Sequence, residues 1–273
     1  MGNEDLGRHY QEIGDLTKAY DAFSRMRQDA LLQKHIADIG RHLVSVAIEQ
    51  RNWVAVASNT QKMLGVSLSS DEEKALQPLI KVAAGLAHLA EGKFSDASTS
   101  FITADFGVGS TFNHIASLND VAIYGGLCAL ASMNRDELQR KVLDNPNFRA
   151  YLELEPHIRR AISFFVNGRY SACLSILEGY RNDYLLDIYL YNHVAELYNR
   201  IRSKSIIQYF IPFSCVTIDS LNEAFAPGGG SIEDELISMI KSGDLEGRID
   251  TQNRVCRPFL CFSKKNLRPC SPL

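Results

Sequence analysis

Apolar and polar positions along this chain repeat with the period of an α-helix, and the predicted helices come in pairs. In the first pair, small residues stand where two antiparallel helices would touch, with aromatic residues beside them: Gly7, Tyr10, Gly14, Ala19 and Phe23. The same spacing returns at Gly85, His88, Gly92, Ala97 and Phe101, and more weakly at Phe164, Gly168, Cys173 and Leu177. The pattern predicts a mainly α fold built from stacked helical hairpins.

A further hairpin is predicted between the first two, with helices over Leu31–Glu49 and Trp53–Leu64 and a break at Gln50–Asn52. The offsets between hairpins are irregular, so we expect a degenerate TPR-like helical-repeat stack rather than a strict array. Asn134 followed three residues later by Glu137 has the spacing of a capping box and predicts a helix start.

The weakly polar run from Val121 to Met133 predicts a small-residue helix. Gly125 and Gly126 would let neighbouring backbones approach this helix closely. At thirteen residues the run is too short to span a bilayer, so no membrane association is expected.

The pattern changes after residue 200. Three short helical segments are predicted at Ser203–Tyr209, Thr217–Phe225 and Ser231–Lys241. A β-hairpin follows, with strands Gly247–Asp250 and Asn253–Val255 joined by a two-residue turn at Thr251-Gln252. Three helices followed by a hairpin predict a winged helix.

An unpaired strand edge is a natural template for a strand of another chain. The outer edge of this hairpin therefore predicts an assembly surface, made of Arg248, Ile249, Asp250, Arg254 and Val255.

These patterns divide the chain into helical repeats at residues 1–92, a helical part at 93–200, a winged helix at 201–255 and an atypical basic tail at 256–273. The tail has no helical period, and its deletion is expected to leave folding nearly unchanged.

The net charge of −3 is uneven, because the last eighteen residues carry +4 and leave −7 for the rest. The net charge of the whole chain does not favour nucleic-acid binding. The acidic N-terminus is not a secretory signal, and Cys128, Cys173 and Cys215 are expected to be reduced, buried thiols. We expect an intracellular protein.

No enzyme chemistry is predicted. The seven histidines contain no H-x-H, H-E-x-x-H or i,i+4 pair, and His35 and His42 lack a third ligand, so we expect neither a metal nor another cofactor. Cys128 stands in an apolar helix that raises rather than lowers a thiol pKa, which argues against a nucleophile.

Nucleic-acid binding through the winged helix is the alternative with the most structural basis. Its second helical segment has no Lys or Arg, and its third begins with Glu233-Asp-Glu235. Basic residues stand before it instead (Arg200, Arg202 and Lys204) and in the hairpin. The missing basic recognition helix favours protein docking.

Four stretches in order carry a resemblance: Asp120–Ala131, Asn134–Leu143, Tyr151–Pro156 and Ile206–Phe213. Together they resemble the subunit-one family of the COP9 signalosome, a complex built largely on PCI-domain subunits. The likeness runs through residues 3 to 255 and implies a TPR-like stack ending in a winged helix, the PCI architecture.

The resemblance implies a non-catalytic scaffold subunit whose partners are other PCI subunits and, indirectly, cullin–RING ubiquitin ligases. The signalosome removes a ubiquitin-like modifier from cullins (deneddylation), and its peptidase motif of the form E…HxH…D is absent here. The implied location is the nucleus and cytoplasm. A proteasome regulatory-lid PCI subunit and a nucleic-acid-binding winged-helix PCI protein remain as alternatives.

Overall fold

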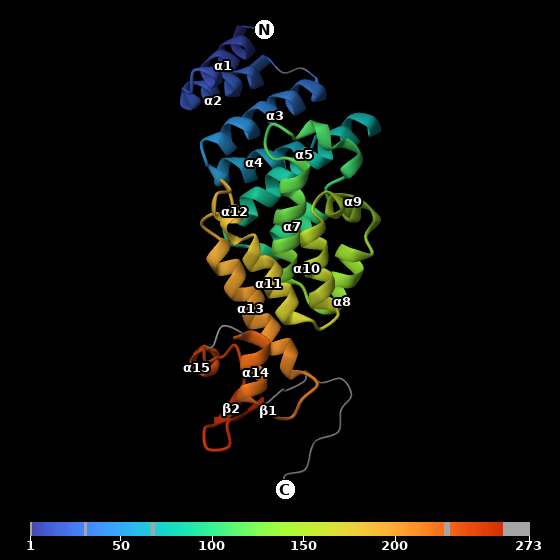
Figure 1. Ribbon diagram of the computed structural model, residues 1–273. Coiled ribbons are helices and arrows are strands. Elements are labelled where there is room, and N and C mark those ends of the chain that lie inside the picture. The colour runs from blue at the N-terminus through green and yellow to red at the C-terminus, as the bar shows by residue number, and fades with distance from the viewer. Residues whose placement is uncertain (1, 30–31, 67–68, 227–229, 259–273) are drawn as a thin grey trace.

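The computed structural model describes residues 2–29, 32–66, 69–226 and 230–258. They form an elongated helical stack with a small winged helix at one end (Figure 1). The helices of the first half are α1 (Gly2–Glu12), α2 (Leu16–Arg25), α3 (Gln33–Glu49), α4 (Trp53–Leu64), α5 (Ser70–Ala90), α6 (Phe94–Ile102) and α7 (Leu118–Ser132), with 3₁₀ turns at Met26–Asp29 and Phe106–Thr111.

The stack continues through α8 (Arg135–Glu137), a π-helical turn at Leu138–Leu143, α9 (Pro146–Leu154), α10 (Pro156–Val166), α11 (Tyr170–Gly179), α12 (Arg181–Leu185) and α13 (Val194–Phe210). The winged helix adds β1 (Val216–Thr217), α14 (Ile218–Phe225), α15 (Glu233–Ser242), β2 (Gly247–Asp250) and β3 (Val255–Pro258). The predicted fold class is confirmed.

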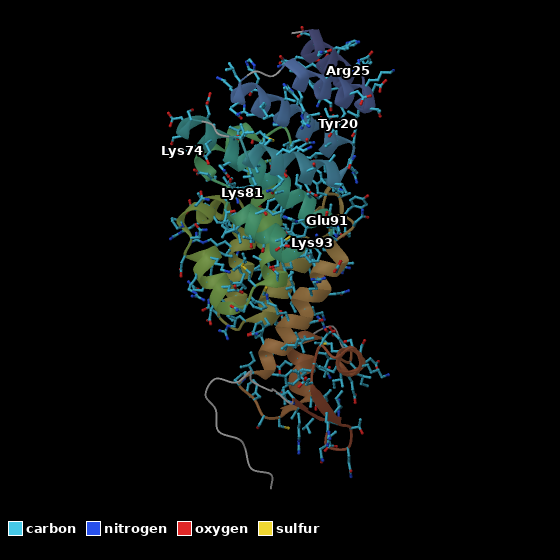
Figure 2. All side chains as sticks on the ribbon, turned by 180° about the vertical axis from the view of Figure 1, so that it is seen from behind. Tyr20, Arg25, Lys74, Lys81, Glu91 and Lys93 are labelled. Atoms are coloured by element: carbon cyan, nitrogen blue, oxygen red, sulfur yellow. The ribbon has the colours of Figure 1, made fainter. Side chains whose placement is uncertain are left out.

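Four hairpins of the stack share one turn. The second residue after the first helix has a left-handed φ, which glycine adopts without steric cost: 82° at Gly14, 72° at Gly92 and 75° at Gly168. The α3–α4 hairpin places Arg51 there with φ 54°. In each turn the next amide donates to a carbonyl five residues back, as from Lys93 to His88 at 2.9 Å. Around Gly92, Glu91 and Lys93 form a 2.7 Å ion pair on the face seen in Figure 2.

The small residues of the predicted hairpins are contact points for aromatic rings. A methyl group added at Gly7 would lie 2.6 Å from the Phe23 ring, and one at Gly85 would lie 2.7 Å from the Phe101 ring. Ala97 is fully buried between its neighbours. Two hairpins far apart in the sequence therefore pack by the same glycine–phenylalanine contact.

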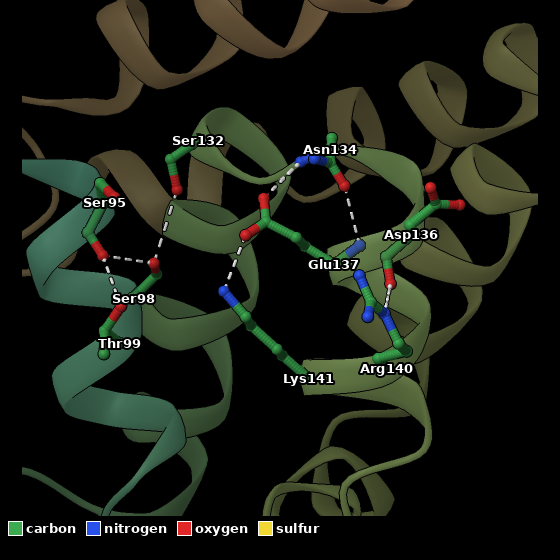
Figure 3. A network of polar contacts seen from close by, with 9 residues as sticks. All are labelled: Ser95, Ser98, Thr99, Ser132, Asn134, Asp136, Glu137, Arg140 and Lys141. Carbon is green, nitrogen blue, oxygen red and sulfur yellow. Dashed lines mark hydrogen bonds and ion pairs between the residues drawn. The ribbon is translucent and has the colours of Figure 1, made fainter. Parts of the chain in front are cut away.

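The close approach predicted at Gly125 and Gly126 on α7 is made by side chains rather than by a backbone. The Phe148 ring of α9 covers Gly125, and Ile158 of α10 covers Gly126, where an added Cβ would lie 2.3 Å from Ile158 Cγ2. The capping box predicted for Asn134 and Glu137 is also present, next to α7 (Figure 3).

One continuous hydrophobic core runs from Ala37 on α3 to Cys256 on β3, and a smaller cluster lies around Phe23. The core passes without interruption across the boundary predicted between residues 92 and 93. The predicted division there stays a prediction.

Two details of the winged helix differ from the sequence-based expectation. The first helical segment, expected at Ser203–Tyr209, is the end of the longer helix α13. The second strand is Val255–Pro258 rather than Asn253–Val255, because the turn has four residues. The Asp250 carboxylate accepts the amides of Gln252 and Asn253 at 3.1 Å each, which extends the turn before pairing begins.

α13 joins the stack to the winged helix and carries a partly buried lysine. The Lys204 ammonium donates to the carbonyls of Leu130 and Met133 at the C-terminal end of α7. Its Nζ lies 4.8 Å from the centre of the Phe165 ring. Burial lowers the pKa of Lys204 to about 8.

Gly126→Ala should lower the free energy of unfolding by about 1–3 kcal/mol, because the new methyl group overlaps Ile158 in a packed core. The control is Gly179→Ala, at a helical glycine with nothing within 4 Å of the added atom. That variant should be as stable as the parent or slightly more so. Chemical denaturation of both variants gives the comparison, and equal losses would contradict the assigned contact.

Lys204 should make stability depend on pH in a defined direction. Between pH 8 and 10.5 the folded lysine has released its proton while the unfolded chain still binds it, so the free energy of unfolding rises with pH. Relative to Lys204→Met, the parent should gain about 1–3 kcal/mol across this range. Below pH 8 the difference should be constant.

Urea titrations of both proteins at several pH values measure this difference. Ionisations common to the two proteins cancel in it. A difference that is flat up to pH 10.5 would contradict the burial of the charge.

Candidate assembly surface

The winged helix contains a three-stranded antiparallel sheet of order β1-β3-β2. β3 lies in the middle, paired with Val216 and Thr217 of β1 on one side and with β2 on the other. The short strand β1 was not predicted, because two residues show no period. Among the described residues, β2 has no partner on its outer side.

The predicted assembly residues fall into two groups. Arg248, Ile249 and Asp250 lie on β2, at the open edge of the sheet. Val255 lies on the central strand instead, between Thr217 and Asp250. Arg254 lies in the turn with φ 52°, and its Nη2 is 3.0 Å from Asp219 on α14. The open edge is therefore β2 alone, without Arg254 and Val255.

The register of the sheet fixes which backbone groups face outward. The Ile218 amide donates to the Arg254 carbonyl at 2.9 Å, so two residues farther along, Cys256 also directs its amide and carbonyl toward β1. Ile249, which is opposite Cys256 on the other side, then forms a non-hydrogen-bonded pair with it. Its N–H and C=O therefore point away from β3, toward the open edge.

Cys256 anchors the centre of this sheet. Its side chain is fully buried, and burial raises the pKa of its thiol to about 11. The boundary predicted after Val255 is therefore wrong, because residues 256–258 complete the wing. The remaining tail, residues 259–273, lies outside the described residues. Cys215, expected in a buried helix, is exposed and precedes β1.

The basic residues before the winged helix are engaged within the chain. Arg202 binds both carboxylate oxygens of Glu235 on α15, at 2.7 and 2.9 Å, and donates to the Phe225 carbonyl at 2.9 Å. Arg200 pairs with Glu196 at 2.7 Å, and Lys204 donates to carbonyls at the end of α7. Arg202 joins α13 to the winged helix and Lys204 joins α13 to α7, whereas the Arg200 pair lies within α13. These contacts leave Arg202 and Lys204 poorly placed to bind phosphate.

The second and third helices of the winged helix present carboxylates. Glu223 on α14 and Asp234 on α15 are exposed, and Glu233 begins α15. Lys74 and Lys81, labelled in Figure 2, lie on α5 in the helical stack, away from this domain. A nucleic acid approaching α14 and α15 would meet negative charge.

Candidate catalytic and metal-binding residues are not brought together. Within the described part of the chain, no group of three His, Cys, Asp or Glu side chains is placed to hold a metal ion. His35 and His42 line the same open cleft of about 850 Å³, where the His42 ring stacks on Phe23. Burial raises the pKa of the Cys128 thiol, and that of Cys173 to about 12.

One hydrogen-bonded chain resembles an acid–base relay and was not found from the sequence. His157 Nδ1 lies 3.2 Å from Glu155, and its Nε2 lies 2.7 Å from the Tyr184 hydroxyl. The Tyr180 ring stacks on the imidazole at 3.8 Å. Tyr184 is buried, which raises its pKa, so it lacks access to a substrate. The contacts join α10 to α12.

No helix in the described ranges is both long enough and apolar enough to cross a membrane. The small-residue helix predicted at Val121–Met133 forms most of α7.

Comparison with known proteins supplies the family. The family model described as 26S proteasome subunit RPN7 matches residues 1–141, and a PCI-domain model matches residues 177–257. The chain is 52% identical over 255 residues to COP9 signalosome complex subunit 1 of Neurospora crassa, covering 93% of this chain and 60% of the relative.

The same-named protein of Emericella nidulans is 50% identical over 266 residues, covering 93% and 53%. The 26S proteasome non-ATPase regulatory subunit 6 of rice is 26% identical over 173 residues, covering 63% and 43%. The chain thus spans between half and two thirds of the length of these two signalosome relatives. The resemblance inferred from the sequence motifs is confirmed.

Removing residues 256–273 should unfold the winged helix, because the deletion takes Cys256 and the central strand with it. The control is a chain ending at Pro258, which keeps every described strand pair. Hydrogen exchange should show α14 and α15 protected in the control and unprotected in the shorter chain. Equal protection in both would mean that β3 is dispensable.

Proposed function

Because the chain belongs to the 26S proteasome subunit RPN7 family and carries a PCI domain at residues 177–257, we propose that it is a non-catalytic structural subunit of the COP9 signalosome. Two relatives that are at least 50% identical to the chain support this choice, since they carry that name. In this role the chain joins other PCI subunits. Its link to cullin–RING ubiquitin ligases is indirect, through the complex that removes a ubiquitin-like modifier from cullins.

The observation that carries the proposal is the open edge of β2. The Ile249 amide and carbonyl point outward with no strand beside them in the described residues. An edge of this kind accepts a strand from another chain through main-chain hydrogen bonds. The Ile249 side chain is half-buried against the core, which keeps the strand in place. The edge therefore suits subunit assembly.

A structural role also agrees with the chemistry of the interior. The buried thiols of Cys128, Cys173 and Cys256 have raised pKa values, so they are poor nucleophiles at neutral pH. The histidine best placed in a hydrogen-bonded chain, His157, is covered by Tyr180. We propose that the chain supplies surface and shape to its complex and leaves the peptidase step to another subunit.

A proteasome regulatory-lid subunit is the second candidate. The matching family model is named for a proteasome subunit, which favours this candidate. The helical stack with a winged helix is common to both complexes, so the fold does not separate them. The lower identity to the rice proteasome subunit, 26% against 52% for the Neurospora signalosome subunit, favours the signalosome. Identification of the subunits that co-purify with the tagged chain separates the two candidates.

Nucleic-acid binding is the weaker alternative. The arginines near the winged helix with described partners bind carboxylates of the same chain: Arg202 with Glu235, and Arg254 with Asp219. We propose a nuclear and cytoplasmic location, which follows the signalosome assignment and can be checked by imaging the tagged chain.

Ile249→Pro should weaken assembly while leaving the chain folded. Proline removes the one outward amide of Ile249, and the β2–β3 hydrogen bonds, made by the flanking residues, stay in place. The matched control is Ile249→Ala, which loses more side chain but keeps the N–H. Co-purification of partner PCI subunits should fall strongly for the proline variant and much less for the alanine variant.

Circular dichroism of both variants checks that the helical stack is intact. Full co-purification with the proline variant would move the assembly surface from the sheet edge to the helices. Equal loss in both variants would assign the effect to the isoleucine side chain.

A further inference from the structure

A turn-rich segment between α12 and α13 concentrates exposed apolar side chains on one side of the stack. Leu185 is 44% exposed, Leu186 84%, Ile188 59% and Tyr191 42%. Single exposed apolar residues are ordinary on protein surfaces, but four within seven residues form a patch of the kind found at interaction sites. We call residues 185–191 the apolar loop.

The apolar loop is held in one conformation from its inner side. The Asp187 carboxylate accepts the amides of Tyr189 and Leu190 at 2.8 Å each, and the Tyr124 hydroxyl at 2.7 Å. The Tyr189 ring packs edge-on against Trp53 of α4, with centroids 6.1 Å apart. A loop fixed in this way loses little conformational entropy when a partner binds, so its apolar side chains are pre-organised for contact.

Arg51 supplies the exposed charge beside the apolar loop. It occupies the left-handed turn position that glycine fills in three other hairpins, and its guanidinium carbon lies 5.8 Å from the centre of the Tyr191 ring. Its Nη1 donates to the Tyr191 hydroxyl at 3.3 Å. The described contacts of Arg51 are with Tyr191 and include no carboxylate, and the loop's own acid, Asp187, is turned inward. The surface is apolar, and at its edge lies a cation with no acidic partner among the described residues.

We propose that the apolar loop and Arg51 form a docking surface for an amphipathic segment of a partner protein, with aliphatic or aromatic side chains next to an Asp or Glu. The apolar side chains cover Leu186 and Ile188, and the carboxylate pairs with the guanidinium, whose planar donors match it. A single cation does not suit a membrane surface or a nucleic acid, both of which need clustered positive charge.

This docking surface is separate from the open edge of β2. α12 lies beside α4 in the middle of the molecule, whereas β2 lies at its lower end (Figure 1). One chain can therefore engage partners at both places. The proposal stands whichever PCI complex contains the chain, because it rests on the stack alone.

Site-specific photo-cross-linking tests the proposal. A photoreactive phenylalanine replaces Leu186 in the full chain, expressed in cells that contain its natural partners, and the control carries it at Leu154, a 39% exposed residue on α9. Cross-links from position 186 should converge on one segment of one protein, and sequencing should find apolar residues flanked by Asp or Glu. Diffuse or absent cross-links, or a lipid or nucleic-acid product, would overturn the proposal.

Substitutions at Arg51 test whether its charge contributes to binding the partner. Arg51→Glu should reduce the cross-link yield from position 186 by at least about tenfold, since it places like charges together. Arg51→Lys keeps the charge and should retain most of the yield. The melting temperature of both variants should match the parent, because the side chain is exposed. An unchanged yield with Arg51→Glu would remove the cation from the site and refute the proposed partner chemistry.

Discussion

The placement of the winged helix depends on α13, which runs without a break from the helical stack into the domain. Two cationic side chains of α13, Lys204 and Arg202, bind partners on different neighbouring elements. Lys204 donates to carbonyls at the end of α7, and Arg202 binds Glu235 on α15 and the Phe225 carbonyl at the end of α14. Both are partly buried, so loss of one partner leaves a polar group of the other with reduced access to water. The sheet therefore keeps a fixed orientation to the stack, and its open edge faces outward.

The helical stack is built from hairpins that repeat the same packing contact and the same turn. Glycine lets a ring lie against a helix, as Phe23 does at Gly7 and Phe101 at Gly85, and a left-handed residue reverses the chain within a few residues. Repetition produces a long, rigid body with one continuous core. Such a body presents surfaces at a distance from one another, which suits a subunit that connects neighbours.

Much of this fold was predictable from the sequence, because glycine, alanine and phenylalanine at fixed spacing report local helix contacts. The second strand of the wing was misplaced, since the Asp250 carboxylate lengthens the turn and the pairing of Cys256 with Val216 is non-local. The assembly edge was predicted at Arg248, Ile249, Asp250, Arg254 and Val255. The strand order, which the sequence pattern does not give, removes Arg254 and Val255 from the open edge. The apolar loop could not be predicted from the sequence, because residues 185–191 follow no helical or strand period.

The central claim is that β2 offers its outer edge to another subunit, and hydrogen exchange at single amides tests it most directly. In the isolated chain the Ile249 amide should exchange quickly, because it points away from β3, while the amides of Arg248 and Asp250 should be protected. In the assembled complex Ile249 should become protected as well. An Ile249 amide that is already slow in the isolated chain, or still fast in the complex, would contradict the account.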